Sequence, residues 1–116
     1  MRYRDVRGLS GAANAAVRML ERERLSPGIV SAALSVWSVR VHGTKRRWRQ
    51  GEAEFTCPCC SEGWARDKLQ QALFMLPPRA AAELRVQIER LDAVLLRRTH
   101  YEPMADPELA WWHRRC

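Results

Sequence analysis

Hydrophobic residues recur at helical spacing over much of this chain, and this recurrence predicts where its helices lie. After Ser10, four apolar positions about one turn apart predict a helix from residue 11 to about Arg24: Ala13, Ala16, Val17 and Leu20. A second run, over residues 64–76, places four apolar positions on one side: Leu69, Ala72, Leu73 and Leu76. Pro77-Pro78 ends that helix, because proline disfavours helical backbone in the residue before it.

The clearest periodicity begins near Pro78 and runs to about Arg98. Its apolar positions step by three and four residues: Ala81, Leu84, Ile88, Leu91 and Leu95. This spacing predicts one helix that packs on its neighbours within the chain. The alternative is a dimer seam along residues 79–98. We favour the first interpretation, because a coiled coil needs more heptads than this stripe supplies.

Residues 27–42 carry two competing patterns. The alternation of Trp37, Val39 and Val41 with polar residues is typical of a strand. The polar positions, however, step by four, three and four, which places them on one stripe of a helix: Ser31, Ser35, Ser38 and His42. Ser26-Pro27 is favoured at a helix start and Gly43 at a helix end. We therefore predict a central, mostly apolar helix, and we interpret the small serines as positions of close helix packing.

The C-terminal region predicts one more short helix. Asp106, Pro107 and Glu108 supply an N-cap, a first-position proline and a first-turn acid in the favoured order. The predicted helix covers residues 107–114 and carries Trp111 and Trp112.

Together these patterns predict a mainly α fold. A chain of 116 residues buries enough surface for one core. We expect a single domain, residues 1–116, formed by a compact bundle of four to five helices. Residues 1–8 are basic and irregular and are expected to be flexible. Gln50-Gly51-Glu52 is typical of the turn of a short β-hairpin, with Trp48 and Phe55 on its apolar face.

Three of the four cysteines stand together, at Cys57-Pro58-Cys59-Cys60. Cys57 and Cys60 have the spacing with which one turn presents two thiolates to a zinc ion, and the turn resembles the knuckles of zinc-ribbon and treble-clef proteins. The fourth, Cys116, stands three residues after His113. We predict a zinc site formed by Cys57, Cys60, His113 and Cys116. Because four protein ligands leave no open coordination position, the ion would be structural and would tie the C-terminal helix to the knuckle.

Three alternatives stay open for the cysteines. Either Cys59 or His100 could replace a member of the ligand set. The C-P-x-C turn also resembles the active site of glutaredoxins, which implies a thiol redox protein with Cys57 as nucleophile and Cys60 as resolving thiol. The helices predicted after Gly63 do not fit the strands of that fold. Finally, the cysteines could be unliganded core residues.

Positive charge exceeds negative charge over the chain as a whole. The chain has 20 Lys and Arg residues against 13 Asp and Glu, a net charge of +7. An acid-free segment, residues 40–49, combines basic residues with a tryptophan, and Arg114 and Arg115 add charge beside the predicted metal ligands. Arginines bind phosphates, and an exposed tryptophan stacks on a base. We therefore predict nucleic-acid contact through Arg40, Lys45, Arg46, Arg47, Trp48, Arg49, Arg114 and Arg115. The alternative is a solvated basic loop with Trp48 in the core.

No enzyme motif stands out. The sequence contains neither a G-x-S-x-G elbow nor H-E-x-x-H nor a phosphate-cradling glycine loop, so we expect a non-enzymatic protein. Met1 to Arg24 lacks the apolar core of a signal peptide, and the longest apolar stretch, Ile29 to Val41, is too short and polar to span a bilayer.

The sequence thus indicates a cytoplasmic, zinc-binding, nucleic-acid-binding helical protein that does not associate with membranes. The alternative is a protein-interaction adaptor or a subunit of a larger assembly, docking through Trp111 or the helix at residues 79–98. The sequence does not define an oligomeric state.

Overall fold

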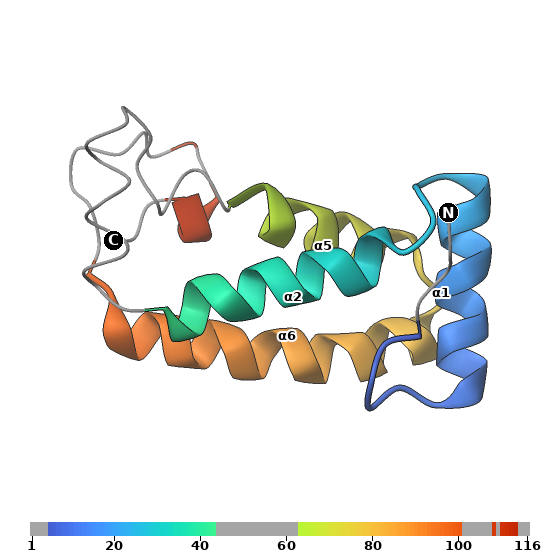
Figure 1. Ribbon diagram of the computed structural model, residues 1–116, viewed down its shortest axis with the longest axis horizontal. Coiled ribbons are helices and arrows are strands. Elements are labelled where there is room, and N and C mark those ends of the chain that lie inside the picture. Colours follow the sequence, from blue (N-terminus) through green and yellow to red (C-terminus); the bar gives the residue numbers. More distant parts are fainter. Residues whose placement is uncertain (1–4, 44–62, 101–107, 109, 114–116) are drawn as a thin grey trace.

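The computed structural model describes residues 5–43, 63–100, 108 and 110–113. In these ranges the chain forms four α-helices and one 3-10 turn: α1 (Gly11–Glu23), α2 (Ile29–His42), α5 (Gly63–Met75), α6 (Pro78–Arg98) and η2 (Trp111–His113). α2 lies between α5 and α6, and α1 crosses one end of these three helices (Figure 1). The predicted mainly α bundle with a central second helix is confirmed. The predicted hairpin and the cysteine turn lie outside the described residues.

The helix starts follow local backbone chemistry. Ser10 caps α1, because its Oγ accepts a backbone N–H of the first turn at 3.1 Å. At α2 the cap predicted at Ser26 is wrong. There the Ser26 carbonyl accepts the Ile29 N–H at 3.1 Å, and Gly28 has φ 77° and ψ 2°. These are the features of a type II turn, with proline and then glycine at its centre, so the helix begins only at Ile29.

Side chains from neighbouring helices hydrogen-bond to backbone groups at both ends of α2. Glu21 of α1 is fully buried, and its Oε2 accepts the Val30 N–H at 2.9 Å. A carboxylate at this end also interacts favourably with the helix dipole. At the other end, Arg98 of α6 donates to the carbonyl oxygens of Val41 and Gly43. α2 is thereby fixed to α1 at its start and to α6 at its end.

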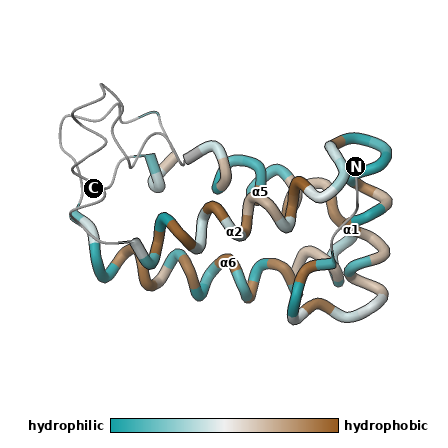
Figure 2. Tube along the Cα trace, viewed as in Figure 1, coloured by the Kyte–Doolittle hydropathy of each residue, from teal (hydrophilic) through white to brown (hydrophobic). Residues whose placement is uncertain are grey.

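The core lies where α2 meets α5 and α6. Its largest apolar side chains are no more than 1% exposed: Trp37, Leu69, Leu84, Ile88 and Leu95. The regular stripe of α6 contributes to this core, so it packs within the chain, as the sequence predicted. Hydrophilic and hydrophobic segments alternate along α6, as expected for a helix buried on one side (Figure 2).

The C-terminal segment differs from the sequence prediction. The helix expected over residues 107–114 is a single 3-10 turn at Trp111–His113 in the described residues, and Ala110 precedes it without helical structure. Before α1, Val6 anchors the N-terminal segment to the bundle. Val6 is buried, and its N–H donates to Oδ1 of Asn14 at 2.8 Å.

Candidate functional site

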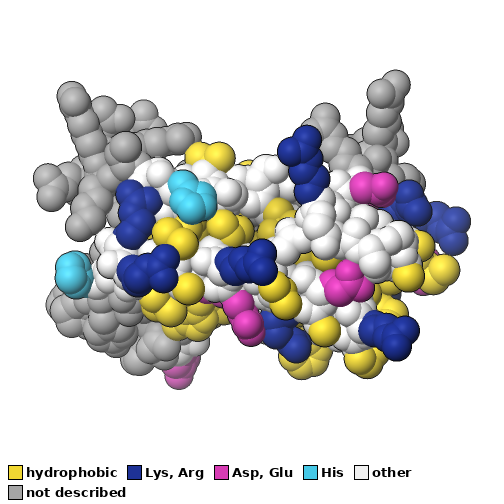
Figure 3. All heavy atoms as spheres, turned by 90° about the horizontal axis from the view of Figure 1, so that it is seen from below, with side chains coloured by type: hydrophobic (Ala, Val, Ile, Leu, Met, Phe, Trp, Pro, Cys, Tyr) yellow, Lys and Arg dark blue, Asp and Glu magenta, His cyan; other side chains and the backbone are white. Residues whose placement is uncertain are grey.

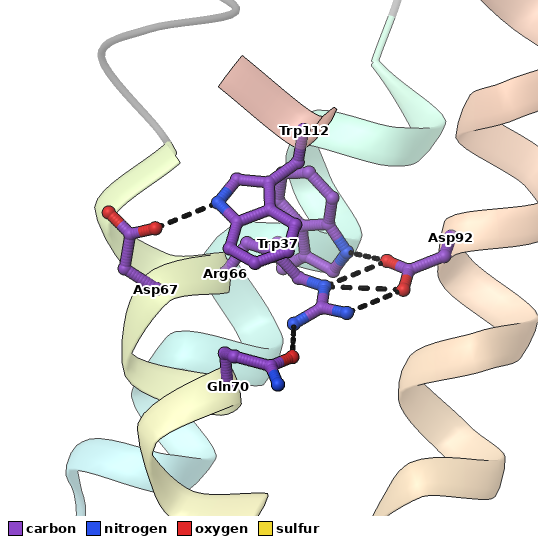
Figure 4. Close-up of polar contacts among 6 residues, drawn as sticks. All are labelled: Trp37, Arg66, Asp67, Gln70, Asp92 and Trp112. Atoms are coloured by element: carbon purple, nitrogen blue, oxygen red, sulfur yellow. Dashed lines mark hydrogen bonds and ion pairs between the residues drawn. The ribbon is translucent and has the colours of Figure 1, made fainter. Parts of the chain in front are cut away.

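A buried polar cluster joins three helices near the end of the bundle where α2 ends and α5 begins. The Asp92 carboxylate of α6 accepts the Trp37 indole N–H at 3.0 Å. It also accepts the Nε and Nη2 hydrogens of Arg66, with a shortest contact of 2.8 Å. Arg66 donates further to Gln70 at 3.0 Å (Figure 4). Arg66 and Asp92 are both buried, so each charge is compensated by the other in a site with little access to water.

The C-terminal turn η2 docks on this cluster. The ring of Trp112 covers the Arg66 guanidinium at 4.4 Å from the ring centroid, which is a cation–π arrangement (Figure 4). Trp111 packs edge-on against Trp112 at 5.6 Å and is half-buried. Trp112 is the buried anchor of the pair.

Asp67 holds both polar side chains of the turn. Its Oδ1 accepts the Trp112 indole N–H at 2.8 Å, and the same carboxylate lies 2.9 and 3.0 Å from Nε2 of His113. The His113 side chain is mostly buried, whereas Asp67 is half-exposed. This contact sets the orientation of the imidazole and leaves its Nδ1 as the nitrogen that could bind a metal ion.

The predicted metal ligands are partly covered by the structure. Of the predicted set, His113 is described, and Cys57, Cys60 and Cys116 lie outside the described residues. The same is true of Cys59. His100, the histidine named as a substitute ligand, is exposed after the end of α6. Within the described ranges, no three His, Cys, Asp or Glu side chains form a group that could hold a metal ion.

The predicted nucleic-acid contacts need one correction. Arg40 is 2% exposed, so in this structure it is not a surface contact for phosphates. It lies three residues after buried Trp37 and seven after buried Ala33, which places it on the inward side of α2. The remaining predicted contacts, Lys45, Arg46, Arg47, Trp48, Arg49, Arg114 and Arg115, lie outside the described residues.

Sequence reasoning missed Arg66, Asp67 and Asp92. Each is an ordinary charged residue on a helix, with no motif around it. One signal was available for Asp67: the sequence predicted that the C-terminal turn meets the cysteine turn, and Asp67 stands near the start of the helix that follows the cysteine turn.

Comparison with known proteins adds no relative: no family model, curated protein or solved structure matches this chain. Among the described helices, none combines the length and apolar character needed to cross a membrane.

Proposed function

We propose that this chain is a small non-enzymatic protein that uses a structural zinc ion to hold together a basic, nucleic-acid-binding end of a helical bundle. The observation that carries the proposal is the Asp67–His113 contact. The C-terminal turn bears one predicted half of the metal site, His113 and Cys116. The contact brings this turn onto α5, the helix that directly follows the other half, Cys57 and Cys60.

Chain length supports this arrangement. Cys60 stands three residues before Gly63, the first residue of α5, and Cys116 stands three residues after His113. Because an extended chain spans at most about 3.6 Å per residue, each cysteine can reach no further than about 11 Å from its anchor. Asp67 is about one helical turn from the start of α5. Both halves of the predicted site are therefore tethered to neighbouring points.

The chemistry of His113 supports the same site. Histidine ligands of zinc commonly donate their second ring N–H to a carboxylate, which fixes the ring and raises its basicity. Asp67 would have this role, with Nδ1 of His113 as the ligand. Three thiolates and one imidazole would complete a tetrahedral site of the structural type.

The placement of charge supports nucleic-acid binding at this end. Residues 45–49 follow Gly43 at the end of α2, and Arg114 and Arg115 follow the docked turn. The end of α2, the start of α5 and η2 lie at the same end of the bundle, opposite α1 (Figure 1). The arginines within residues 45–49, with Arg114 and Arg115, would contact phosphates. Trp48 would stack on an unpaired base.

Metal analysis of the full chain, purified without chelators, tests the zinc site. We expect one zinc ion per chain. The variants Cys60→Ser and His113→Ala should lose the ion, whereas the variants Cys59→Ser and His100→Ala should retain it. Asp67→Asn should weaken zinc binding by about 10–100-fold, as removal of such a supporting group does elsewhere. Gln71→Ala, an exposed change on the same helix, should not weaken it. A folded, metal-free protein with an acidic Cys57 thiol would instead favour the redox alternative.

Fluorescence anisotropy with labelled single- and double-stranded RNA and DNA tests the second half of the proposal. Affinity should fall steeply with salt, because each neutralised phosphate contributes a slope of about −0.7 to −0.9 in log affinity against log salt. Arg46→Glu/Arg47→Glu should weaken binding strongly. Arg22→Glu/Arg24→Glu, the matched charge reversal at the C-terminal end of α1, at the opposite end of the bundle, should have little effect. Equal effects of the two variants, or affinity that does not change with salt, would overturn the proposal.

A further inference from the structure

A second surface, away from the C-terminal turn, has the features of a protein-binding groove. An open groove of about 1120 Å³ runs between α2 and α6, with residues 5–8 along one side. Three serines from the polar stripe of α2 line it: Ser31, Ser35 and Ser38. These small side chains therefore face a groove, where the sequence interpretation expected close contact with a neighbouring helix.

The side of the groove formed by residues 5–8 is fixed in place. Gln87 of α6 donates to the Arg7 carbonyl oxygen at 2.6 Å. Glu83, one turn earlier, accepts from the backbone N–H and the hydroxyl of Ser10 at 2.8 and 2.9 Å. Gly8 has φ 88°, and a Cβ on it would lie 2.7 Å from the Gln87 amide nitrogen. The groove is thus formed before any partner arrives, which lowers the cost of binding.

Apolar side chains form part of the groove lining. Val39 of α2 and Val86 of α6 are 46% and 48% exposed, and Leu34 and Leu91 extend this surface inward. On the face of the molecule that carries α6, hydrophobic side chains lie between basic ones (Figure 3). A combination of exposed apolar side chains and small neighbours suits the apolar stripe of a helix better than the sugar-phosphate backbone of a nucleic acid.

The groove lining carries two acids and two arginines, and these differ in the partners they have within the chain. The two acids are engaged: Asp5 pairs with Arg18 at 3.2 Å, and Glu83 holds Ser10. The two arginines, Arg7 and Arg90, have side chains without an ion pair or hydrogen bond to any other described residue. A complementary partner therefore carries carboxylates beside its apolar stripe.

We propose that this groove binds an acidic amphipathic helix of a partner protein. Large aliphatic side chains of that helix pack on Val39, Val86, Leu34 and Leu91. A row of side chains along the same helix passes over the serines of α2. Its flanking carboxylates meet Arg7 and Arg90. This surface lies between α2 and α6 and uses none of the residues assigned above to zinc or nucleic acid, so the two proposals stand or fall separately.

The test uses the full chain and a labelled helical peptide of about 18 residues, or five turns. The probe carries leucines on one face and glutamates along both flanks. Two comparison peptides have the same composition in scrambled order, or lysine in place of each glutamate. We expect the acidic amphipathic probe to bind roughly tenfold more tightly than either comparison peptide, which is the scale of a single strong contact.

Paired variants locate the site. Ser35→Trp fills the groove and should weaken binding roughly tenfold or more, whereas Ala32→Trp, at an exposed α2 position that does not line the groove, should not. Arg90→Glu should weaken binding of the acidic probe, and Arg85→Glu, exposed on α6 but not lining the groove, should leave it unchanged. Equal binding of the scrambled peptide would overturn the proposal, as would insensitivity to Ser35→Trp. Displacement of the probe by an oligonucleotide would show that the groove binds nucleic acid instead.

Discussion

Asp92→Ala tests whether the buried polar cluster holds the bundle together. The substitution leaves the Arg66 guanidinium, 6% exposed, without its carboxylate, and leaves the Trp37 N–H without an acceptor. Loss of one partner of a buried ion pair costs about 3–5 kcal/mol, and an unsatisfied buried donor costs about 1–3 kcal/mol. The two losses overlap because one carboxylate serves both groups, so we expect a decrease of about 3–5 kcal/mol in the free energy of unfolding. Small domains have about 5–15 kcal/mol in total, so the loss is a large fraction of the stability.

Urea unfolding followed by far-ultraviolet circular dichroism measures this difference. Glu89→Ala, an exposed change on the same helix, is the control and should alter stability by no more than about 0.5 kcal/mol. Arg66→Met/Asp92→Leu removes both charges together, and it should be less destabilising than Asp92→Ala because no buried charge is left alone. An Asp92→Ala variant within about 1 kcal/mol of the parent would refute the reasoning, as would a double variant no more stable than the single one.

Two further predictions concern the helix connections, each measured by the same unfolding assay. Gly8→Ala should destabilise the chain by about 1–2 kcal/mol, because alanine is strained at positive φ and its Cβ would displace Gln87. The control Gly11→Ala has open space around the new Cβ, so it should be neutral or stabilising. Glu21→Ala should cost about 1–3 kcal/mol, because it leaves a buried N–H of the first turn of α2 without its side-chain acceptor. Exposed Glu23→Ala should change little. A cost for Gly11→Ala equal to that of Gly8→Ala, or equal costs for the two glutamate variants, would contradict these assignments.

The sequence predicted the helices well where two local signals agreed. α6 begins at Pro78 and ends at Arg98, as expected, because a proline start and a regular apolar stripe both mark it. Around Ser26 the signals conflicted. Serine followed by proline is typical of a helix start, yet proline followed by glycine is also typical of a type II turn. The turn formed, because glycine tolerates the positive φ at its third position.

Arg40 shows why a charge run is a weak predictor of a binding surface. The sequence placed it with the basic residues that follow, but the helical register of α2 continues through it and turns it inward. A composition-based prediction ignores that register.

The polar cluster could not be predicted from the sequence for a different reason. Asp92 pairs with Arg66 across 26 residues and with Trp37 across 55, and no local pattern encodes a contact between separate helices.

The cluster and the C-terminal turn are mechanically connected through Arg66. Asp92 of α6 fixes the guanidinium on which Trp112 packs, and Asp67, the next residue of α5, binds both Trp112 and His113. The position of the imidazole therefore depends on the packing of α5 against α6 as well as on its own chain. A metal ion bound by His113 would draw on this rigidity, because a ligand held in place loses less entropy on binding. The helical core therefore determines the position of the C-terminal turn, and the turn determines the geometry of any site at this end of the molecule.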